Sequence, residues 1–381
     1  MNYILFDANR ESLFPLTHTR PISEIRIGIL TIKEKWAKYL GSDPSTQTAD
    51  YLQKKHPLKK EADNLYIYGG VCPNKALVAA IQQLADGEGL YAGDTLLAYR
   101  NAANQKVIFA EEFTKIEKLW HIFQYNAIEL QTDFDLLTAG RKSQVLSDTN
   151  LIMGSENIFV EEGAKLEGAI LNATTGPIYI GKNAEVMEGS IVRGPFAMCE
   201  HSVLKMGAKI YGATTLGPYC KVGGEVNNSV LMSYSNKGHD GFLGNSVLGE
   251  WCNIGADTNN SNLKNNYAEV RLWSEQAGRF EKTGLQFCGL IMGDHSKCGI
   301  NTMFNTGTIV GVSANIFGAG FPRNFVPSFA WGGSAGYSTY QLPKVFETAE
   351  KVMMRRGVPF DDTEKAILQQ VFELTSEQRN F

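Results

Sequence analysis

The chain of 381 residues is longer than a typical compact domain, so two or three structural units are expected. A hydrophobic content of 43%, a charged content of 20% and a mean hydropathy of −0.18 exclude a largely disordered chain and argue against a membrane protein. The 36 basic and 40 acidic side chains leave a net charge of −4, without the basic excess typical of nucleic-acid binders. Any phosphate-binding cluster must therefore be a local pocket.

Cysteine usage and the opening residues indicate the compartment. The six cysteines are widely spaced, and no two have the spacing of a metal-binding knuckle, so we expect reduced thiols and no metal site. Asp7 and Arg10 interrupt the opening segment where a signal peptide needs an apolar core. No apolar run approaches the length of a membrane span. We expect a cytoplasmic protein with no membrane or nucleic-acid partner.

Residues 1–145 mix the sequence patterns of strands and helices. Residues 3–6 form a short apolar run typical of a buried first strand, and residues 29–40 carry apolar side chains at helical spacing. Strand-like runs follow at 65–69 and 106–109. This alternation predicts a small α/β domain at the N-terminus.

The second segment, residues 146–340, is rich in glycine and has a six-residue period. Of the 38 glycines, 29 lie between residues 151 and 340. Apolar residues recur at every sixth position from Ile180 to Val222, and the same register returns from Met292 to Ile316. Neither helices nor ordinary strands have this period. It predicts a solenoid of short strands with a triangular cross-section, in which three hexapeptides complete one coil.

Two stretches of this segment, residues 227–246 and 257–285, break the six-residue register. We expect both to form loops or arms that project from the coil. Insertions of this kind often carry the functional site of a solenoid protein.

The last segment, residues 341–381, returns to helical spacing. Its apolar residues form two stripes, which Gly357 and Pro359 separate. We expect two C-terminal helices that cap the end of the solenoid or pack against a neighbour.

The six-residue pattern resembles that of the left-handed parallel β-helix of the hexapeptide-repeat acyltransferases. Within it, residues 225–263 resemble the acetyltransferase half of the bifunctional GlmU family, which acetylates glucosamine 1-phosphate and then uridylylates it. In that family a glutamate–valine pair precedes a histidine by fourteen residues, and an asparagine–isoleucine–glycine–alanine segment begins fourteen residues after the histidine. Here the pair begins at Glu225, the histidine is His239 and the segment begins at Asn253.

This resemblance implies an acetyl-CoA-dependent N-acetyltransferase that acts on an amino-sugar phosphate. His239 would be the general base that removes a proton from the substrate amine, which suits an imidazole because its ordinary pKa lies near neutrality. The resemblance assigns Asn253 and Asn262 to the orientation of the sugar and acyl groups. Lys205 stands where the family has an arginine for the sugar phosphate. The family also implies a homotrimer, with acyl-CoA bound in the cleft between parallel solenoids.

The sequence departs from the family pattern at three positions. Asn227 stands where the family has a lysine for the phosphate, and Phe242 and Leu263 stand where it has tyrosines. We keep Asn227 as a substrate-binding candidate. Lys237, two residues before His239, is a further candidate because it would restore the missing positive charge. The alternative interpretation of His239 is a solvated histidine in a glycine-rich loop.

The segment after the first strand, residues 6–28, looks like an altered nucleotidyltransferase signature loop, and GlmU-like proteins place such a domain before the solenoid. Loops of this kind bind a triphosphate with backbone N–H groups, and they need glycines so that the backbone can approach the phosphates closely. No glycine lies between Asp7 and Pro21. Arg10 and Arg20 would supply positive charge instead, with a nucleoside triphosphate and Mg²⁺ as ligands. The alternative is a domain that has lost this chemistry.

Three functions follow from these patterns. The leading hypothesis is acyl transfer to an amino-sugar phosphate by the solenoid, for nucleotide-sugar synthesis. The second is sugar-1-phosphate nucleotidyl transfer with a purely structural solenoid, and its activity would survive replacement of His239. The third is a non-catalytic trimeric scaffold that binds a sugar nucleotide, which leaves the loop around His239 unexplained.

Overall fold

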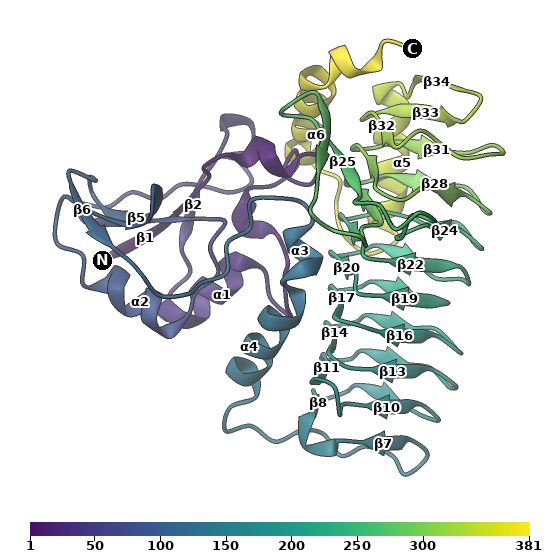
Figure 1. The fold of residues 1–381 in the computed structure, drawn as a ribbon, viewed down its shortest axis with the longest axis horizontal. Coiled ribbons are helices and arrows are strands. Elements are labelled where there is room, and N and C mark those ends of the chain that lie inside the picture. The colour runs from purple at the N-terminus through teal and green to yellow at the C-terminus, as the bar shows by residue number, and fades with distance from the viewer.

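A computed structural model describes all 381 residues of the chain (Figure 1). The first unit is an α/β domain, as predicted. Its strands are β1 (Asn2–Phe6), β2 (Ser45–Gln47), β3 (Asn64–Tyr68), β4 (Glu88–Ala92), β5 (Thr95–Arg100) and β6 (Gln105–Ile108). Its helices are α1 (Ile32–Leu40), α2 (Lys75–Gln82), α3 (His121–Gln124) and α4 (Asn126–Thr138). The strands form one sheet with the order β2-β1-β3-β5-β4-β6, in which β1 runs parallel to both of its neighbours.

Helix α1 confirms most of the helix predicted over 29–40 but begins at Ile32. Thr31 caps it, because its hydroxyl accepts from the Glu34 N–H while the Glu34 carboxylate accepts from the Thr31 N–H. Gly41 ends it in the left-handed conformation, with φ of 67°. Residues 29 and 30 stay outside because their N–H groups donate to the buried Asp133 carboxylate instead.

The second unit is a left-handed parallel β-helix with three faces. The first face contains β7 (Leu151–Met153), β10 (Ile170–Asn172), β13 (Ile191–Arg193), β16 (Lys209–Tyr211), β19 (Glu225–Asn227) and β22 (Phe242–Gly244), continued by the pair β24 (Asn259–Asn260) and β29 (Met303–Phe304). The second face contains β8 (Ile158–Val160), β11 (Ile178–Ile180), β14 (Phe196–Met198), β17 (Thr214–Leu216), β20 (Val230–Leu231), β23 (Val247–Leu248), β27 (Leu290–Met292), β30 (Thr308–Val310) and β32 (Phe325–Val326). The third face contains β9 (Lys165–Leu166), β12 (Glu185–Val186), β15 (Val203–Leu204), β18 (Lys221–Val222) and β21 (Asn236–Lys237), and further along the coil β28 (Lys297–Cys298), β31 (Asn315–Ile316), β33 (Ala330–Gly333) and β34 (Gly336–Thr339).

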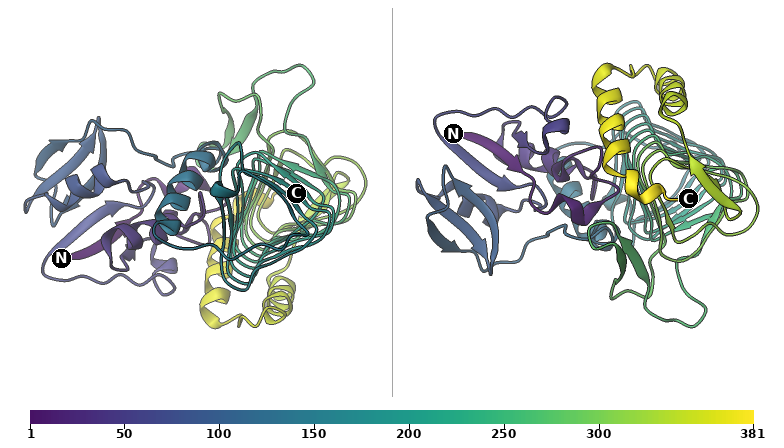
Figure 2. Two further views of the ribbon diagram at one scale, coloured as in Figure 1. Left: turned by 90° about the horizontal axis from the view of Figure 1, so that it is seen from below. Right: turned by 90° about the horizontal axis from the view of Figure 1, so that it is seen from above.

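The six-residue register describes the interior of this coil. Ile180, Met198 and Leu216 are register partners on successive turns, 18 residues apart. All of the predicted register positions belong to one cluster of 35 buried residues along the coil axis. The triangular cross-section is visible when the coil is viewed along its axis (Figure 2).

The expectation of a projecting arm at residues 227–246 was wrong. These residues continue the coil through β20, β21 and β22, but with shorter corners. Leu216 pairs with Leu231 and Val222 with Lys237, each 15 residues on, so the six-residue spacing is lost while the coil persists. The expectation for 257–285 is confirmed in part, because the antiparallel hairpin of β25 (Arg271–Ser274) and β26 (Arg279–Lys282) leaves the coil.

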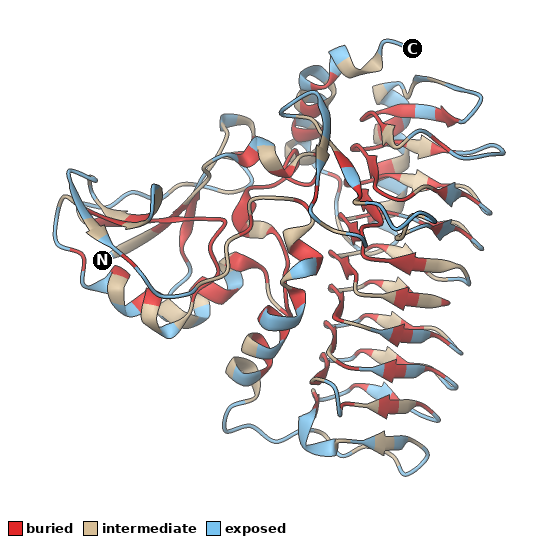
Figure 3. Cartoon of the chain, viewed as in Figure 1, coloured by how far each residue is buried: buried red, intermediate tan, exposed pale blue.

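The first unit covers the second face of the coil. Outward-facing residues of that face, including Val230, Val247 and Ile291, join a core cluster with residues of the N-terminal sheet such as Leu5 and Ile67. Helix α4 packs further along the same face, where its Leu130 and Phe134 meet Phe159 and Tyr179. Buried residues therefore run without interruption from the coil into the first unit (Figure 3).

A polar joint, formed by residues 18–20 and Asp294, connects the two units. Asp294, which is buried, accepts hydrogen bonds from the Thr19 hydroxyl (2.6 Å) and from the Arg20 guanidinium. Burial opposes ionisation, but the Arg20 charge lowers the pKa of the Asp294 carboxyl. Nearby, His18 Nε2 lies 2.9 Å from Glu275 of the projecting hairpin. The loop after β1 is therefore fixed against the solenoid.

A ladder of stacked rings, His201, Tyr219, Tyr234, Trp251 and His295, lies at the corner between the second and third faces. All five residues have positive φ, between 55° and 62°. This conformation closes a tight corner, and it is energetically unfavourable for residues other than glycine. Stacking of successive rings stabilises this corner.

The predicted C-terminal helices are confirmed as α5 (Leu342–Met354) and α6 (Asp362–Leu374). They pack against the corner between the second and third faces, at Trp251 and Phe329, and against Leu52 of the first unit. Viewed along the coil, they and the β25–β26 hairpin lie on opposite sides of the contact with the first unit (Figure 2). No helix in the structure combines the length and the apolar character that a membrane crossing requires.

Candidate active site

A groove of about 620 Å³ runs along the third face of the coil, and the end of α5 forms one of its walls. Its floor consists of outward-facing residues on successive turns. Lys221 pairs with Asn236, Asn236 with Asn253 and Asn253 with Lys297. Neighbouring strands lie about 4.8 Å apart, so these side chains form one continuous polar row.

The groove is lined by five cationic side chains and by no carboxylate. The cations are Lys205, Lys221 and Lys297 from the coil, and Arg355 and Arg356 from the end of α5. Arg356 is positioned by a hydrogen bond of 2.9 Å from Nη2 to Oδ1 of Asn236. Five like charges in one concave site repel one another until an anion neutralises them, so the groove suits a phosphate group.

This repulsion and burial affect the lysine pKa values. Burial and the nearby Arg356, Lys205 and Arg355 lower the pKa of Lys221. Burial lowers the pKa of Lys297 to about 8. Lys297 is therefore a cation at neutral pH that loses its charge in mildly alkaline solution.

His239 lies at the corner between β21 and β22, at the edge of the groove. Its ring is exposed, and no protein group forms a hydrogen bond with either ring nitrogen. A free imidazole nitrogen beside a cationic groove is able to accept a proton from a bound ligand. The backbone N–H groups of Gly238 and Ala256, which also line the groove, donate to no acceptor within the protein.

Lys237 lies inside the coil and does not line the groove. Its register partner is the inward-facing Val222, and its ammonium donates to the carbonyls of Gly223 (2.8 Å) and His239 (2.9 Å). Burial lowers the pKa of Lys237 to about 8. Lys237 therefore stabilises the backbone at the His239 corner from inside the coil. The prediction that it contacts substrate was wrong.

The structure brings Lys205, His239 and Asn253 together in the groove and places Asn227 and Asn262 elsewhere. Both lie toward the corner between the first and second faces. Asn227 Nδ2 donates to the Tyr211 carbonyl (3.3 Å), and Asn262 Nδ2 donates to Oδ1 of Asn245 (2.8 Å). Within one chain, these two asparagines and His239 do not share a site.

Four of the five groove cations were not predicted from the sequence. Lys221 and Lys297 each precede an inward register residue, Val222 and Cys298, and adjacent strand residues point to opposite faces. That signal was available and would have placed both lysines on the outer surface. No sequence pattern connects Arg355 and Arg356 with the coil, because their position depends on how α5 packs.

The two arginines expected to bind phosphate in the first unit are occupied by protein partners. Arg10 is buried and donates to the Thr17 carbonyl (2.5 Å) and to the Tyr51 hydroxyl (2.9 Å). Arg20 is buried in the joint with Asp294. The Arg20 guanidinium is thus paired within the protein, and Nη1 of Arg10 is held by two protein oxygens.

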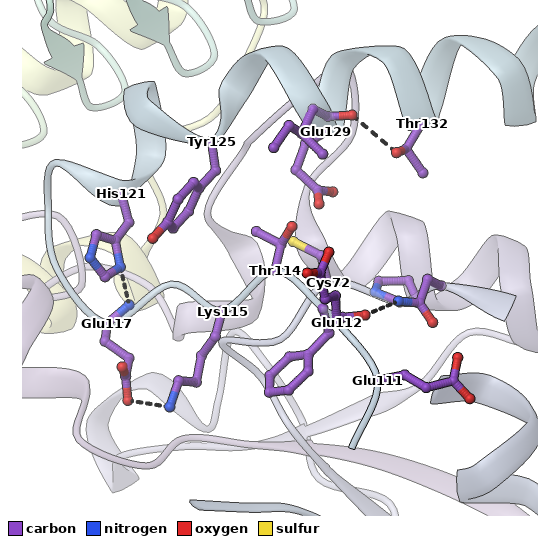
Figure 4. Close-up of a pocket in the computed structure, with 14 residues that line it drawn as sticks. Cys72, Glu111, Glu112, Thr114, Lys115, Glu117, His121, Tyr125, Glu129 and Thr132 are labelled. Carbon is purple, nitrogen blue, oxygen red and sulfur yellow. Dashed lines mark hydrogen bonds and ion pairs between the residues drawn. The ribbon is translucent and has the colours of Figure 1, made fainter. Parts of the chain in front are cut away.

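A second cavity, of about 730 Å³, lies in the first unit beside α3 and α4 (Figure 4). Its walls include the loops that follow β3 and β6, at the edge where ligands bind in many open α/β sheets. Four carboxylates line it, from Glu111, Glu112, Glu117 and Glu129, against the single lysine Lys115. Glu129 points from α4 toward Cys72 in Figure 4. This acidic lining disfavours a triphosphate.

The side chains present do not fit a resident metal ion. No three His, Cys, Asp or Glu residues converge in an arrangement that would hold one. Asp7, at the end of β1, is occupied: its carboxylate accepts from the Ile22 N–H (2.9 Å) and from the Thr48 hydroxyl (2.5 Å).

Comparison with known proteins gives one family match. Residues 3–142 match a family model described as "Sugar nucleotidyl transferase", which covers the first unit and well under half of the chain. No curated protein matches the chain.

Two solved structures are similar to part of the chain. One is a UDP-N-acetylglucosamine acyltransferase from Arabidopsis, with 14% identity over 58% of this chain and 79% of that one, and a TM-score of 0.24. The other is a UDP-N-acetylglucosamine acyltransferase from Francisella novicida, with 15% identity over 61% of this chain and 85% of that one, and a TM-score of 0.22. TM-scores of this size support no inference about the activity of this chain. The first unit is thus similar to sugar nucleotidyl transferases, and the candidate site lies in the solenoid.

Proposed function

We propose that the chain is an acetyl-CoA-dependent N-acetyltransferase that acts on an amino-sugar phosphate, with a nucleotidyltransferase-like first domain. The observation that carries this proposal is the combination of one free imidazole, His239, with five cations and no carboxylate in one groove. A general base next to an anion site fits a substrate that bears both an amine and a phosphate. The match of residues 225–253 to the GlmU pattern supports the same reaction.

In the proposed mechanism, the substrate reacts as the free amine, and His239 accepts one proton from the amine nitrogen as it attacks. The amine nitrogen forms a bond to the thioester carbonyl carbon, and the carbon–sulfur bond then breaks. The thiolate of CoA takes up the proton from the imidazolium and leaves as a free thiol. The N–H groups of Gly238 and Ala256, which line the groove and have no acceptor in the protein, would stabilise the oxyanion of the tetrahedral intermediate.

The groove cations would hold the substrate phosphate. Arg355 and Arg356 offer planar forks that suit a phosphate, and Lys221 is close enough to both for their charges to lower its pKa. Binding of a dianion removes this repulsion, so the phosphate gains more from the cluster than from a single cation. Asn253, on the groove floor, would contact the sugar or acyl group.

The proposal includes assembly as a homotrimer. Asn227 and Asn262 lie on a different corner of the coil from His239, so they reach a substrate in the groove only from a neighbouring copy. A neighbouring coil against the open side of the groove would also create the narrow cleft that a CoA arm needs.

The test is a thiol-release assay on the full chain. Acetyl-CoA is incubated with glucosamine 1-phosphate, with other amino-sugar phosphates and with unphosphorylated glucosamine, and free thiol is followed over time. We expect release with at least one phosphorylated amino sugar and at least tenfold slower release with glucosamine. Release with none of the acceptors, or with no preference for the phosphate, contradicts the proposal.

The charge of Lys297 predicts a pH effect on acceptor binding. Because its pKa lies at about 8, Lys297 is protonated below that pH and neutral above it. We expect KM for the acceptor phosphate to rise severalfold between pH 7 and pH 9. In Lys297→Met the rise over this interval should be much smaller, and KM at pH 7 should already be high. Identical pH profiles of KM for the two proteins would contradict this role.

The two arginines of the α5 wall predict an effect on KM. Replacing both Arg355 and Arg356 by glutamine removes two charge-assisted contacts, each worth about 1.5 to 3 kcal/mol. We expect KM for the phosphorylated acceptor to rise at least tenfold, with little change in KM for acetyl-CoA. Lys351→Gln is the matched control, because this exposed cation lies on the same helix and pairs with Glu347 outside the groove. An equal rise in the control would show an effect of net charge alone.

A second candidate function is sugar-1-phosphate nucleotidyl transfer, which the family match of residues 3–142 favours. The acidic cavity of the first unit and the pairing of Arg20 with Asp294 weigh against it. Pyrophosphate release from a nucleoside triphosphate and a sugar 1-phosphate, in the presence of magnesium, would establish this activity. It would be independent of His239.

A further inference from the structure

One charged side chain occupies an inward position on the third face of the coil. The inward row of this face contains Leu166, Val186, Leu204, Val222, Lys237, Ile254, Cys298 and Ile316. Every member except Lys237 belongs to the hydrophobic core of the coil, whereas Lys237 is a cation that is only 1% exposed. Burying an ammonium is costly unless its N–H groups find acceptors, so packing alone does not explain a lysine here.

The ammonium of Lys237 connects the corners of two successive turns. Its Nζ donates to the carbonyl of Gly223 (2.8 Å), which follows β18 on one turn. It also donates to the carbonyl of His239 (2.9 Å), which follows β21 on the next turn. No backbone N–H donates to either carbonyl, so Lys237 is the only protein donor for both. We call this arrangement the Lys237 clamp.

The clamp operates without a bonded carboxylate. Asp240, Asp257 and Glu225 are the acidic groups that act on Lys237 through their charge, but none forms a hydrogen bond with its ammonium. Burial outweighs their attraction and lowers the pKa of Lys237 to about 8, so the side chain is still a cation at neutral pH. Its charge therefore strengthens the two hydrogen bonds to the corner carbonyls.

The corner that carries His239 needs such a support. Gly238 precedes the histidine, and Gly241, with φ of 109°, follows two residues later. Glycine loses more conformational freedom than any other residue when the backbone is ordered. The exposed His239 ring has no hydrogen bond of its own to the protein, so its location depends on the backbone that carries it.

We propose that Lys237 is a positioning residue for acyl transfer, because its buried ammonium fixes the backbone from which His239 presents its imidazole to the groove. This inference rests on the function proposed above for His239. Lys237 touches no substrate, since it lies inside the coil and does not line the groove. It acts through His239, and a displacement of about 1 Å at a catalytic group can lower the rate about a hundredfold.

The experiment is a double-mutant cycle on the full chain, with Lys237→Met and His239→Ala made singly and together. Methionine has nearly the length of lysine and is apolar like the rest of the inward row, so the variant should fold. We expect Lys237→Met to lower kcat for thiol release about tenfold or more. KM for the acceptor should change less than about threefold, because the groove cations stay in place.

The double variant and a packing control show whether Lys237 acts through His239. Adding Lys237→Met to His239→Ala should change kcat by less than about twofold, because the base that the clamp positions is already gone. The control is Leu231→Met, an inward substitution on the same turn, which should leave kcat within about a factor of two of the wild type.

Amide hydrogen exchange tests the clamp without any substrate. Exchange at residues 238–244 reports local opening of the corner, and we expect it to be about tenfold faster or more in Lys237→Met than in the wild type. Exchange at residues 191–198, on a distant turn, should not change. A wild type that releases no thiol would contradict the proposed function, whereas unchanged exchange at the corner would contradict the clamp.

Two kinetic outcomes would also overturn the positioning role. One is a Lys237→Met protein whose kcat equals that of the wild type. The other is an equal fall in kcat when Lys237 is replaced in the wild type and in His239→Ala, which would show that the lysine acts independently of the histidine.

Discussion

Replacing His239 by alanine is expected to lower kcat for acyl transfer by at least a hundredfold, while KM for the sugar phosphate changes less than threefold. A positioned general base contributes about 10² to 10⁴ in rate, and the groove cations that bind the phosphate stay in place. The exposed ring forms no hydrogen bond with the protein, so thermal unfolding of the variant should match that of the wild type. Steady-state thiol release over a range of acceptor concentrations separates kcat from KM.

The matched control is His201→Ala. His201 stacks on Tyr219 in the ring ladder and does not line the groove. We expect its kcat to stay within a factor of two of the wild type. A His239→Ala protein that keeps more than a tenth of wild-type kcat would contradict the assignment of the base and favour the interpretation of His239 as a solvated loop residue.

The second large effect concerns the joint between the two units. Asp294→Ala leaves the buried Arg20 guanidinium without its closest counter-ion, and breaking a buried pair of this kind costs about 3 to 5 kcal/mol. We expect the free energy of unfolding, measured in urea, to fall by an amount in that range. The exposed pair between Asp362 and Lys365 supplies the control, since Asp362→Ala should change stability very little.

A double variant tests the cause of this loss. In Arg20→Met with Asp294→Leu, both charges are replaced by apolar groups of similar size, which is often neutral or stabilising for a buried pair. Most of the lost stability should return. A double variant as unstable as Asp294→Ala would show that packing or the Thr19 hydrogen bond, and not the unpaired charge, holds the joint.

Much of the coil could be predicted from the sequence because its interior positions are occupied by apolar residues at a regular six-residue spacing. Ile180, Met198 and Leu216 lie on successive turns because three hexapeptides complete one coil. The rule failed at residues 227–246, where corners lose residues and the period disappears while the coil continues. The same failure explains Lys237. Its 15-residue distance from Val222 places it in an inward position that the six-residue register does not reveal.

The candidate site was only partly predictable. The intervals around His239 locate its corner, and Lys205 and Asn253 follow from the same pattern. The arginines of the groove lie on a helix that reaches the coil only through tertiary packing, through contacts such as Arg356 to Asn236. The expectation for Arg10 and Arg20 rested on their charge, but their partners, Thr17, Tyr51 and Asp294, are set by the fold.

The most direct measurement is a crystal structure of the full chain with CoA and glucosamine 1-phosphate bound together. We expect the sugar phosphate in the groove on the third face, with its phosphate against Lys221, Arg355 and Arg356. The amine should lie within hydrogen-bond distance of a His239 ring nitrogen, and the CoA sulfur should lie close to the amine. A sugar phosphate bound elsewhere, or an amine that His239 cannot reach, would contradict the account.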